Sequence, residues 1–422
     1  MTKVKKALIA SFVLRIVAAA LSFGVSVLLA RLLGPAEYGL YAATIAIVML
    51  LAIPSEFGIG TVLVKYVSAY QKINSLASLR ALLSWAGGTV AKSSIAIALV
   101  AAIFSLFFSL PNSYEEKKVL LICLIALPIY ALGEMRAAAL RGLRRSVLGQ
   151  LPEAIIRPAL VLGSVIFVDF IVAPKSIDAS IVAGCFIFAS MIAFLIGAYF
   201  LKRSLPKFNN QNKGLAEKNE WIRSAIVLSF TKGGRVIINR IDLVFVAILA
   251  GNVEAGIYKV AASLSILIAF GLNAINNVIG PHFSRAYVAE DYRRLRSLFS
   301  KTSVASLLMA LPIFLGLYFY GEELLLVFYG EDFSNAYPVL LVLAVAQLVN
   351  ASAGPAGLLA NMTGNEKWVM TVTISILVIS VPLHFMMIQR YEAIGGAIVV
   401  LLSMIGIRLL IGWKIIRFLR AL

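Results

Sequence analysis

The sequence predicts an all-α integral membrane protein of about twelve transmembrane helices, in two six-helix lobes related by a parallel pseudo-two-fold repeat. Three observations support this fold class. Hydrophobic residues make up 61% of the chain and charged residues only 14%, with a mean hydropathy of +0.94. Apolar stretches of about 20 residues, the length needed to cross a bilayer, recur along the whole chain. A polar motif of the first half returns in the second half at the same spacing.

The apolar stretches are expected to be helices, because a backbone inside lipid must satisfy its own hydrogen bonds. They lie near 7–33, 39–64, 81–110, 119–143, 152–173, 179–201, 222–250, 254–281, 297–320, 336–360, 367–389 and 393–417. The first stretch is too long for a signal peptide, contains Arg15 and is followed at once by another span. We therefore interpret it as a retained helix.

The net charge of +18 does not indicate a nucleic-acid-binding protein, because of where the charges lie. Most lysines and arginines fall in loops that share one side when the spans alternate. The opposite loops contain acids such as Glu322, Glu323, Glu331 and Asp332. This bias predicts that both termini are cytoplasmic. For most of these basic residues, setting the topology and contacting anionic lipid head groups is a sufficient explanation.

One hydrophilic stretch divides the chain almost in half. The sequence predicts an N-terminal lobe at 1–201, a cytoplasmic linker at 202–221 and a C-terminal lobe at 222–422. Because six spans is an even number, the two lobes enter the membrane from the same side. A shift of 217 positions aligns them, and matches Gly34, Glu37, Gly39 and Tyr41 with Gly251, Glu254, Gly256 and Tyr258.

The repeated motif predicts a tight hairpin between helices. Gly34 with Pro35, and Gly251, end their helices because proline and glycine stop helical propagation. Glu37 and Glu254 then fall in the first turn of the next helix, where the helix dipole favours a carboxylate. A structural turn on the outer face is the simpler interpretation, and a gating role is the alternative.

Polar residues inside four spans are candidate site residues, because a charge in the membrane is costly. They are Lys232, Arg235, Asn239 and Asp242 in the seventh span, Lys259 in the eighth, Arg15 in the first and Glu56 in the second. The four residues of the seventh span lie in an arc of roughly 80° on one helical face. An arginine- and lysine-lined cavity suits an anionic group such as a diphosphate. Alternatively, Asp242 pairs with Arg235 or Arg240, and Arg15 extends to the inner surface.

The carboxylates of Asp242 and Glu56 are candidates for ion coupling. The chain has no phosphate-binding glycine loop, so a transport function would have to draw on an ion gradient or the membrane potential. Either carboxylate can take up H⁺ or Na⁺ in one state and a basic partner in the other. Alternatively, Glu56 only packs beside Pro54, and Asp242 stays on its arginine. The two cysteines and two histidines have no metal-ligand spacing, and no metal or other cofactor is expected.

Four stretches resemble the polysaccharide transporter, or oligosaccharide flippase, family, which includes O-antigen flippases. They are "LARLLGPAEYGLYAAT", "SEFGIGTVLVKYVS", "ALRGLRRSVLGQLPEAIIRPAL" and "NRIDLVFVAILAGNVEAGIYKVA". The larger group, the multidrug/oligosaccharidyl-lipid/polysaccharide flippase superfamily, also contains lipid II flippases and multidrug and toxin extruders. The family has an aspartate in the seventh span that corresponds to Asp242. Its basic residues in the membrane vary, so roles for Arg15, Lys232 and Arg235 rest on position.

The resemblance implies an inner-membrane protein that moves a polyprenyl-diphosphate-linked oligosaccharide from the cytoplasmic to the outer leaflet by alternating access. It also implies V-shaped lobes around a cationic central cavity, and a polysaccharide polymerase and a chain-length regulator as partners. Two other functions remain open. One is an ion-coupled drug or toxin exporter of the same superfamily, whose cavity is usually acidic or aromatic. The other is a membrane polymerase or glycosyltransferase, which usually needs a long outer loop, whereas the longest outer loop expected here is about fifteen residues, near 321–335.

Overall fold

The computed structural model describes residues 3–73, 75–107, 113–171, 177–205, 218–225 and 240–421, and within these ranges all regular structure is helical. The predicted all-α fold is therefore confirmed. The chain forms two compact units. The first contains Met1–Leu33 and Leu40–Arg240, and the second contains Gly34–Gly39 and Ile241–Leu422. Most of the predicted linker at 202–221 lies outside the described residues.

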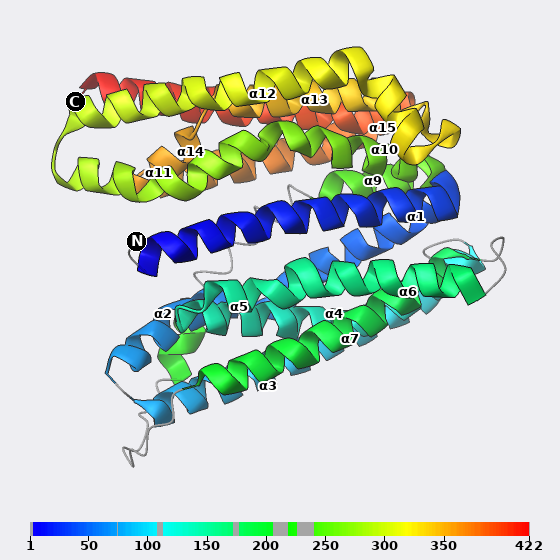
Figure 1. Cartoon of the computed structure of the whole chain (residues 1–422), viewed down its shortest axis with the longest axis horizontal. Helices are drawn as coiled ribbons and strands as arrows, with labels where there is room; N and C mark the ends of the chain where they lie inside the picture. Colours follow the sequence, from blue (N-terminus) through cyan, green and yellow to red (C-terminus); the bar gives the residue numbers. More distant parts are fainter. Residues whose placement is uncertain are drawn as a thin grey trace. The chain divides into compact units, whose positions relative to one another are not determined.

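The helices follow one another along both halves of the chain (Figure 1). The first half contains α1 (Lys3–Glu56), α2 (Ile59–Lys72), α3 (Leu76–Phe107), α4 (Tyr114–Gly142), α5 (Ser146–Leu151), the π-helical turn η1 (Pro152–Ile156), α6 (Arg157–Ile171) and α7 (Ala179–Ser204). The second half contains α9 (Ile241–Ala250), α10 (Asn252–Ser265), the 3₁₀ turn η2 (Ile266–Ala269), α11 (Phe270–Val288), α12 (Tyr292–Tyr329), the 3₁₀ turn η3 (Glu331–Phe333), α13 (Ala336–Ser352), α14 (Ala356–Met362) and α15 (Glu366–Ala421).

These helices account for the predicted spans. Among the described residues, eight are long and apolar enough to cross a membrane, and the pair α13 and α14, bent by 41°, adds a ninth. α1 has 54 residues and α15 has 56, each more than twice the roughly 20 that a span requires. Because α1 breaks at Gly34 and α15 at Glu392, each represents two predicted spans. Of the predicted seventh span, 222–250, the structure describes 222–225 and 240–250, the latter with α9.

The duplicated motif has the same backbone conformation in both copies. Gly34 has φ 69° and ψ 177°, and Gly251 has φ 91° and ψ 176°, a region that favours glycine. The two copies also contact each other within the second unit. A Cβ atom on Gly39 would overlap the carbonyl of Asn252, and one on Gly256 would overlap that of Pro35. Since 35 and 252 also differ by 217, these two close approaches are equivalent by the repeat.

Two predicted boundaries were wrong. The second span was expected to run from 39 to 64, but its helix ends at Glu56, because Phe57 and Gly58 have φ 43° and 66°. The loop expected near 321–335 is shorter than predicted, because α12 continues to Tyr329 before Gly330 ends it at φ 97°. Helical hydrogen bonding therefore extends well past the apolar window from which the ninth span was predicted.

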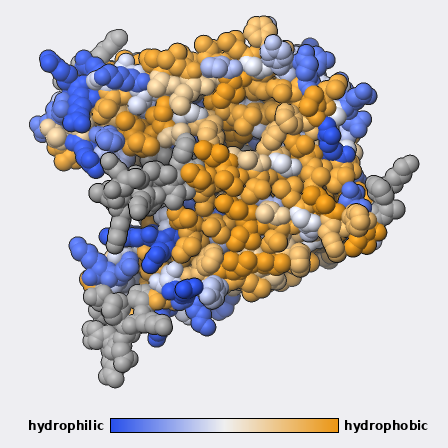
Figure 2. Space-filling model, in the orientation of Figure 1, coloured by the Kyte–Doolittle hydropathy of each residue, from blue (hydrophilic) through white to orange (hydrophobic). Residues whose placement is uncertain are grey.

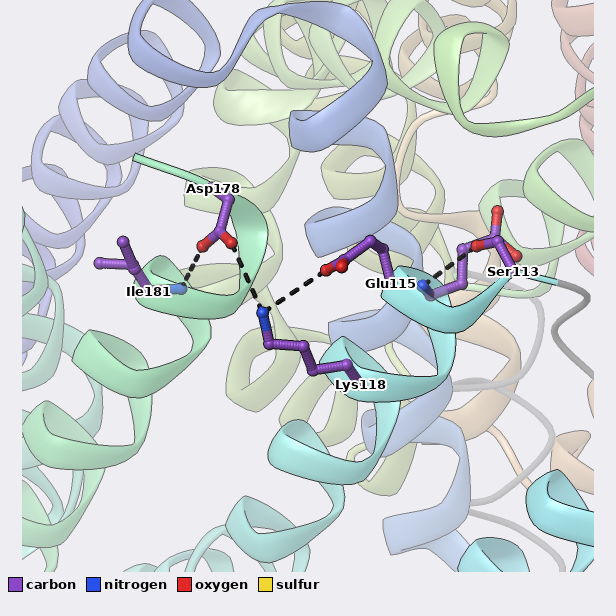
Figure 3. Close-up of polar contacts among 6 residues, drawn as sticks. Ser113, Glu115, Lys118, Asp178 and Ile181 are labelled. Atoms are coloured by element: carbon purple, nitrogen blue, oxygen red, sulfur yellow. Dashed lines mark hydrogen bonds and ion pairs between the residues drawn. The ribbon is translucent and has the colours of Figure 1, made fainter. Parts of the chain in front are cut away.

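In the first unit, α4 and α7 run parallel and are joined near their first residues (Figure 3). Ser113 and Asp178 cap the two helices by accepting hydrogen bonds from the backbone N–H groups of Glu116 and Ile181. The Nζ atom of Lys118 lies 3.8 Å from an Asp178 oxygen and 3.5 Å from a Glu115 oxygen. These contacts join the beginnings of α4 and α7.

In the second unit, α13 packs between α12 and α15 (Figure 1). Near one end of these helices, a buried apolar cluster joins α11, α12, α14 and α15 through residues such as Phe283, Leu295, Leu359 and Ile415. Apolar side chains cover the middle of the helices in view and hydrophilic ones gather near helix ends (Figure 2). Exposed Leu, Ile, Val and Phe side chains are expected where helices face lipid.

Candidate functional site

Four of the seven predicted site residues fall within the described part of the chain. Arg15 is exposed on α1, and Glu56 is buried at the end of the same helix. Asp242 begins α9 and Lys259 is half-buried on α10, both in the second unit. The other three, Lys232, Arg235 and Asn239, lie outside the described residues.

Asp242 is held by a tyrosine rather than by a described cation. The hydroxyl of Tyr258, a side chain only 1% exposed, donates a hydrogen bond to Asp242 Oδ2. Asp242 Oδ1 is buried and has no hydrogen-bond partner within the described residues. The alternative pairing of Asp242 with Arg235 or Arg240 stays a prediction, because Arg235 lies outside the described residues and Arg240 belongs to the first unit. Tyr258 is itself one of the four identities of the repeat.

His384 is a neighbour of Asp242 that the sequence analysis did not select. Its ring stacks on Phe245 of α9 at 5.3 Å between ring centroids, and it is near enough for the charge of Asp242 to act on it. His384 Nδ1 lies 2.7 Å from the carbonyl oxygen of Ser380, so Nδ1 carries the hydrogen. His384 Nε2 is buried and has no partner among the described residues. The sequence feature that could have identified His384 is a histidine inside a predicted span.

The cluster of Asp242, Tyr258 and His384 can therefore accept a proton or another small cation. A carboxylate oxygen accepts hydrogen bonds, and Nε2 of a neutral imidazole protonated at Nδ1 carries a lone pair. Burying such acceptors without donors costs free energy. Uptake of a proton by the Asp242 carboxylate would remove a buried charge and so lower that cost, and would also change the net charge of the cluster.

Glu56 belongs to a second group of ionisable side chains, in the first unit. The charges of Glu56, Glu134, Arg157 and Arg240 all act on the phenol of Tyr130, which places these groups near one another. Glu56 is only 9% exposed and directly precedes Phe57, which has a positive φ. Strained backbone of this kind is often found at functional positions. The group contains as many arginines as glutamates.

The charges next to this group form a buried chain of ion pairs. Arg136, 2% exposed, donates a hydrogen bond of 2.5 Å to Glu153 Oε1, and Arg157 Nη1 lies 3.4 Å from Glu153 Oε2. Arg136 Nη1 also donates to the carbonyl oxygens of Ala193 and Phe194 on α7. The Arg157 guanidinium lies 5.6 Å from the centre of the Tyr130 ring. Glu153 thus binds two arginines at once.

Local backbone features make this chain of ion pairs possible. Glu153 lies in the π-helical turn η1, a distortion that begins at Pro152. Gly197 lies directly under the Arg136 guanidinium, and Gly133 lies under the Glu153 carboxylate, where any Cβ would overlap them. The sequence analysis quoted the stretch at 139–160 for its family resemblance and did not pair Arg136 with Glu153. Their joint contact with α7 depends on packing that no local pattern shows.

Comparison with known proteins identifies relatives across most of the chain. The model of the polysaccharide biosynthesis protein family matches residues 4–287, and the MatE model matches residues 234–386. A probable low-salt glycan biosynthesis flippase of Haloferax volcanii is 22% identical, over 93% of this chain and 79% of that protein. The succinoglycan biosynthesis transport protein ExoT of Rhizobium meliloti is 26% identical, over 76% and 61%. A putative O-antigen transporter of Shigella flexneri is 22% identical, over 70% and 68%.

Solved structures show the same fold. An inward-facing multidrug resistance MATE transporter of the MOP superfamily has a TM-score of 0.74 at 13% identity, covering 96% of this chain and 95% of its own. The lipid II flippase MurJ, in an inward closed conformation, has a TM-score of 0.71 at 17% identity, covering 96% and 86%. The three sequence relatives are named as transporters or flippases, not as enzymes. With a family model that matches two thirds of its length, the chain belongs to the polysaccharide biosynthesis protein family of membrane proteins.

Proposed function

We propose that this protein is a flippase that moves a polyprenyl-diphosphate-linked oligosaccharide from the cytoplasmic to the outer leaflet of the inner membrane by alternating access. The observation that carries the proposal is the 93% coverage of the chain by a relative named as a glycan biosynthesis flippase. The transported oligosaccharide serves synthesis of a surface polysaccharide such as O-antigen, capsule or exopolysaccharide. A polysaccharide polymerase and a chain-length regulator act on it afterwards.

The main test is deletion of the gene in its own cells. Surface polysaccharide should be lost, and the lipid-linked oligosaccharide should accumulate in the inner leaflet. Analysis of extracted lipid intermediates measures this outcome directly. Normal lipid-linked intermediates together with altered drug resistance would contradict the flippase and support the exporter.

The exporter is the second candidate function, and one observation favours it. The MatE model matches residues 234–386, which include Asp242 and His384. The three sequence relatives nevertheless cover at least 70% of this chain, and their names refer to glycan biosynthesis, succinoglycan biosynthesis or O-antigen transport. A dye-efflux assay on membrane vesicles containing the purified protein separates the two functions, because only the exporter should move a cationic dye.

We propose that five residues bind the diphosphate. They are Arg15, Lys232, Arg235, Asn239 and Lys259. The exposed side chain of Arg15 supports this, because its charge is accessible to a substrate. A diphosphate requires positive charge, so Arg15→Ala, Lys232→Ala and Arg235→Ala should each reduce polysaccharide export at unchanged protein level. Arg15→Lys, Lys232→Arg and Arg235→Lys should partly retain it. Full export by the triple alanine variant would remove these residues from the site.

We propose that Asp242 couples transport to an ion gradient and that Glu56 has a corresponding role in the first unit. The buried Oδ1 of Asp242 and its lack of a described cationic partner support this role. The role of Glu56 is supported by the burial of its side chain and by the ionisable groups around Tyr130. A unit charge crossing 100 mV gains about 2.3 kcal/mol, which is enough to bias two conformers roughly fifty-fold. Transport in vesicles under an imposed H⁺ or Na⁺ gradient should depend less on that gradient in Asp242→Asn. Unchanged dependence in both Asp242→Asn and Glu56→Gln would contradict the proposal.

The proposed topology places both termini in the cytoplasm. A cysteine introduced in the 201–221 segment should then resist an impermeant thiol reagent in intact cells, and one introduced at Asn335 should react. The buried Cys123 and Cys185 should give little background labelling. The reverse pattern would contradict this orientation.

A further inference from the structure

An apolar groove runs along the first unit, between α3, α4 and α7. Its volume of about 350 Å³ is within the range of small-ligand sites, roughly 300–1,000 Å³. The wall is formed by side chains such as Leu83, Leu132, Phe194 and Leu201, with the small Ala198 at one position. Lys202 lines the same groove and is exposed, and none of the described lining residues is acidic.

The floor of the groove is fixed by contacts described above. Arg136 lines the groove and is held by Glu153 and by the carbonyl oxygens of Ala193 and Phe194. Its guanidinium lies 5.7 Å from the centre of the Phe194 ring, which forms part of the wall. Because the floor joins α4 to α7 by buried charged hydrogen bonds, the groove cannot close by small movements of these helices.

Aromatic residues place one end of the groove at the level of a membrane interface. Trp221 Nε1 donates a hydrogen bond of 3.0 Å to Tyr70, and the Trp221 and Trp85 rings lie 5.5 Å apart. Trp85 follows the groove residue Ser84 in α3, and Lys202 lies in the last turn of α7. Trp221 and Tyr70 are buried, so the interfacial level is indicated by the half-buried Trp85 and by Lys202 and Arg203 in the last turn of α7. Tryptophan lies where hydrocarbon meets head groups, and lysine there faces lipid phosphates. The groove therefore extends from a head-group level into the apolar layer.

We propose that this groove holds one acyl chain of an anionic phospholipid, with the lipid phosphate bound by Lys202. The wall matches a hydrocarbon chain, and the single cation at the interfacial end matches a phosphate. Arg80 lies one helical turn before Leu83 on α3, and adds positive charge on the same side of the helix. The bound lipid fills the space between α3 and α7 and stabilises the first unit. This role is independent of which substrate the protein transports.

The test measures lipid retention by the purified full-length protein. Native mass spectrometry after incubation with phosphatidylglycerol should show a bound lipid. Equimolar phosphatidylcholine should be retained about fivefold less, because about a fivefold difference is what one contact between a lysine and an anionic lipid contributes. Ala198→Phe should remove the bound phosphatidylglycerol, because the ring occupies the groove. Lys202→Gln should reduce retention about fivefold. Arg203→Gln is the matched control, because Arg203 is adjacent and exposed but does not line the groove.

Thermal unfolding in solution gives a second measurement of lipid binding, which does not depend on ionisation in the mass spectrometer. Phosphatidylglycerol should raise the midpoint of unfolding of the wild type and of Arg203→Gln, and should raise it little in Ala198→Phe. Equal retention by Ala198→Phe and wild type would overturn the proposal. So would retention of undecaprenyl phosphate in preference to phosphatidylglycerol, which would assign the groove to a polyprenyl chain instead.

Discussion

The two units differ in the hydrogen-bond partners of their buried charged groups. In the first, Arg136 and Arg157 share the carboxylate of Glu153, and Arg136 binds two carbonyl oxygens of a neighbouring helix in addition. In the second, Asp242 receives one hydrogen bond, from Tyr258, and its other oxygen and the Nε2 atom of His384 have no partner among the described residues. In the first cluster most of the buried donors are used, although Arg136 Nε has no partner among the described residues. The second has acceptors that are not used.

This difference suggests different roles for the two clusters. A buried ion pair contributes little net stability, but removing one partner leaves an uncompensated charge and is strongly destabilising. The Arg136–Glu153 pair is therefore a rigid structural element of α4, η1 and α7. Unused acceptors in a buried position favour the binding of a proton or cation, so the Asp242 cluster is the better candidate for a group that changes state during transport.

The largest effect is expected for Glu153→Ala, which breaks the first cluster. Two buried guanidinium groups would lose their carboxylate, and the free energy of unfolding should fall by about 3–5 kcal/mol. Thermal unfolding of the purified protein and its level in membranes measure this loss. The matched control is Glu115→Ala, whose side chain is 60% exposed and whose pair with Lys118 should contribute under about 1 kcal/mol. Similar losses in both variants would contradict a special role for Glu153.

Tyr258→Phe should produce an intermediate effect. The carboxylate of Asp242 would lose its described donor, which costs about 1–3 kcal/mol when the group remains buried. Combining Tyr258→Phe with Asp242→Leu should recover part of this loss, because both polar groups are then removed. Tyr199→Phe, at a tyrosine that is 57% exposed, serves as the control. A double variant less stable than Tyr258→Phe alone would argue against an isolated carboxylate in this cluster.

His384→Phe should affect coupling more than stability. The new ring can keep the stacking on Phe245, and the loss of the hydrogen bond to Ser380 should cost only about 0.5–1.5 kcal/mol. If Nε2 helps to bind the coupling ion, transport in vesicles should depend less on the imposed gradient than in the wild type. An unchanged gradient dependence at normal protein level would exclude His384 from ion binding. Asp242 would then remain as the candidate for that role in the cluster.

The smallest effect is expected for Lys118→Met at the end of α4 and α7. Lys118 is 41% exposed and makes long contacts with Glu115 and Asp178, so its removal should change stability by only about 0–1 kcal/mol. Raising the salt concentration should reduce this small difference further. A change as large as that of Glu153→Ala would show that the register of the two helices is set at this end and not by Arg136.

The sequence by itself determined the helical membrane fold and the position of the repeated hairpin. Hydropathy and glycine conformation are local properties, so the spans and the turns at Gly34 and Gly251 can be read from neighbouring residues. Glu56 could be selected as a charge in apolar surroundings, and Asp242 as part of a polar stripe on one face of the seventh span. Residue spacing did not, however, show where helices extend past their apolar windows, as α12 does to Tyr329.

Only the tertiary structure decided which polar groups meet. Arg136 and Glu153 are 17 positions apart, and Asp242 lies 142 positions before His384, in a different helix. Gly39 and Gly256 could be matched as a repeat, yet their mutual contact appears only when the two hairpins pack together. Side-chain partners between distant helices depend on how the helices pack and rotate, and many packings satisfy the same hydropathy pattern. For this reason the sequence predicted which polar residues cost free energy in lipid. The fold determined which hydrogen bonds and ion pairs offset that cost.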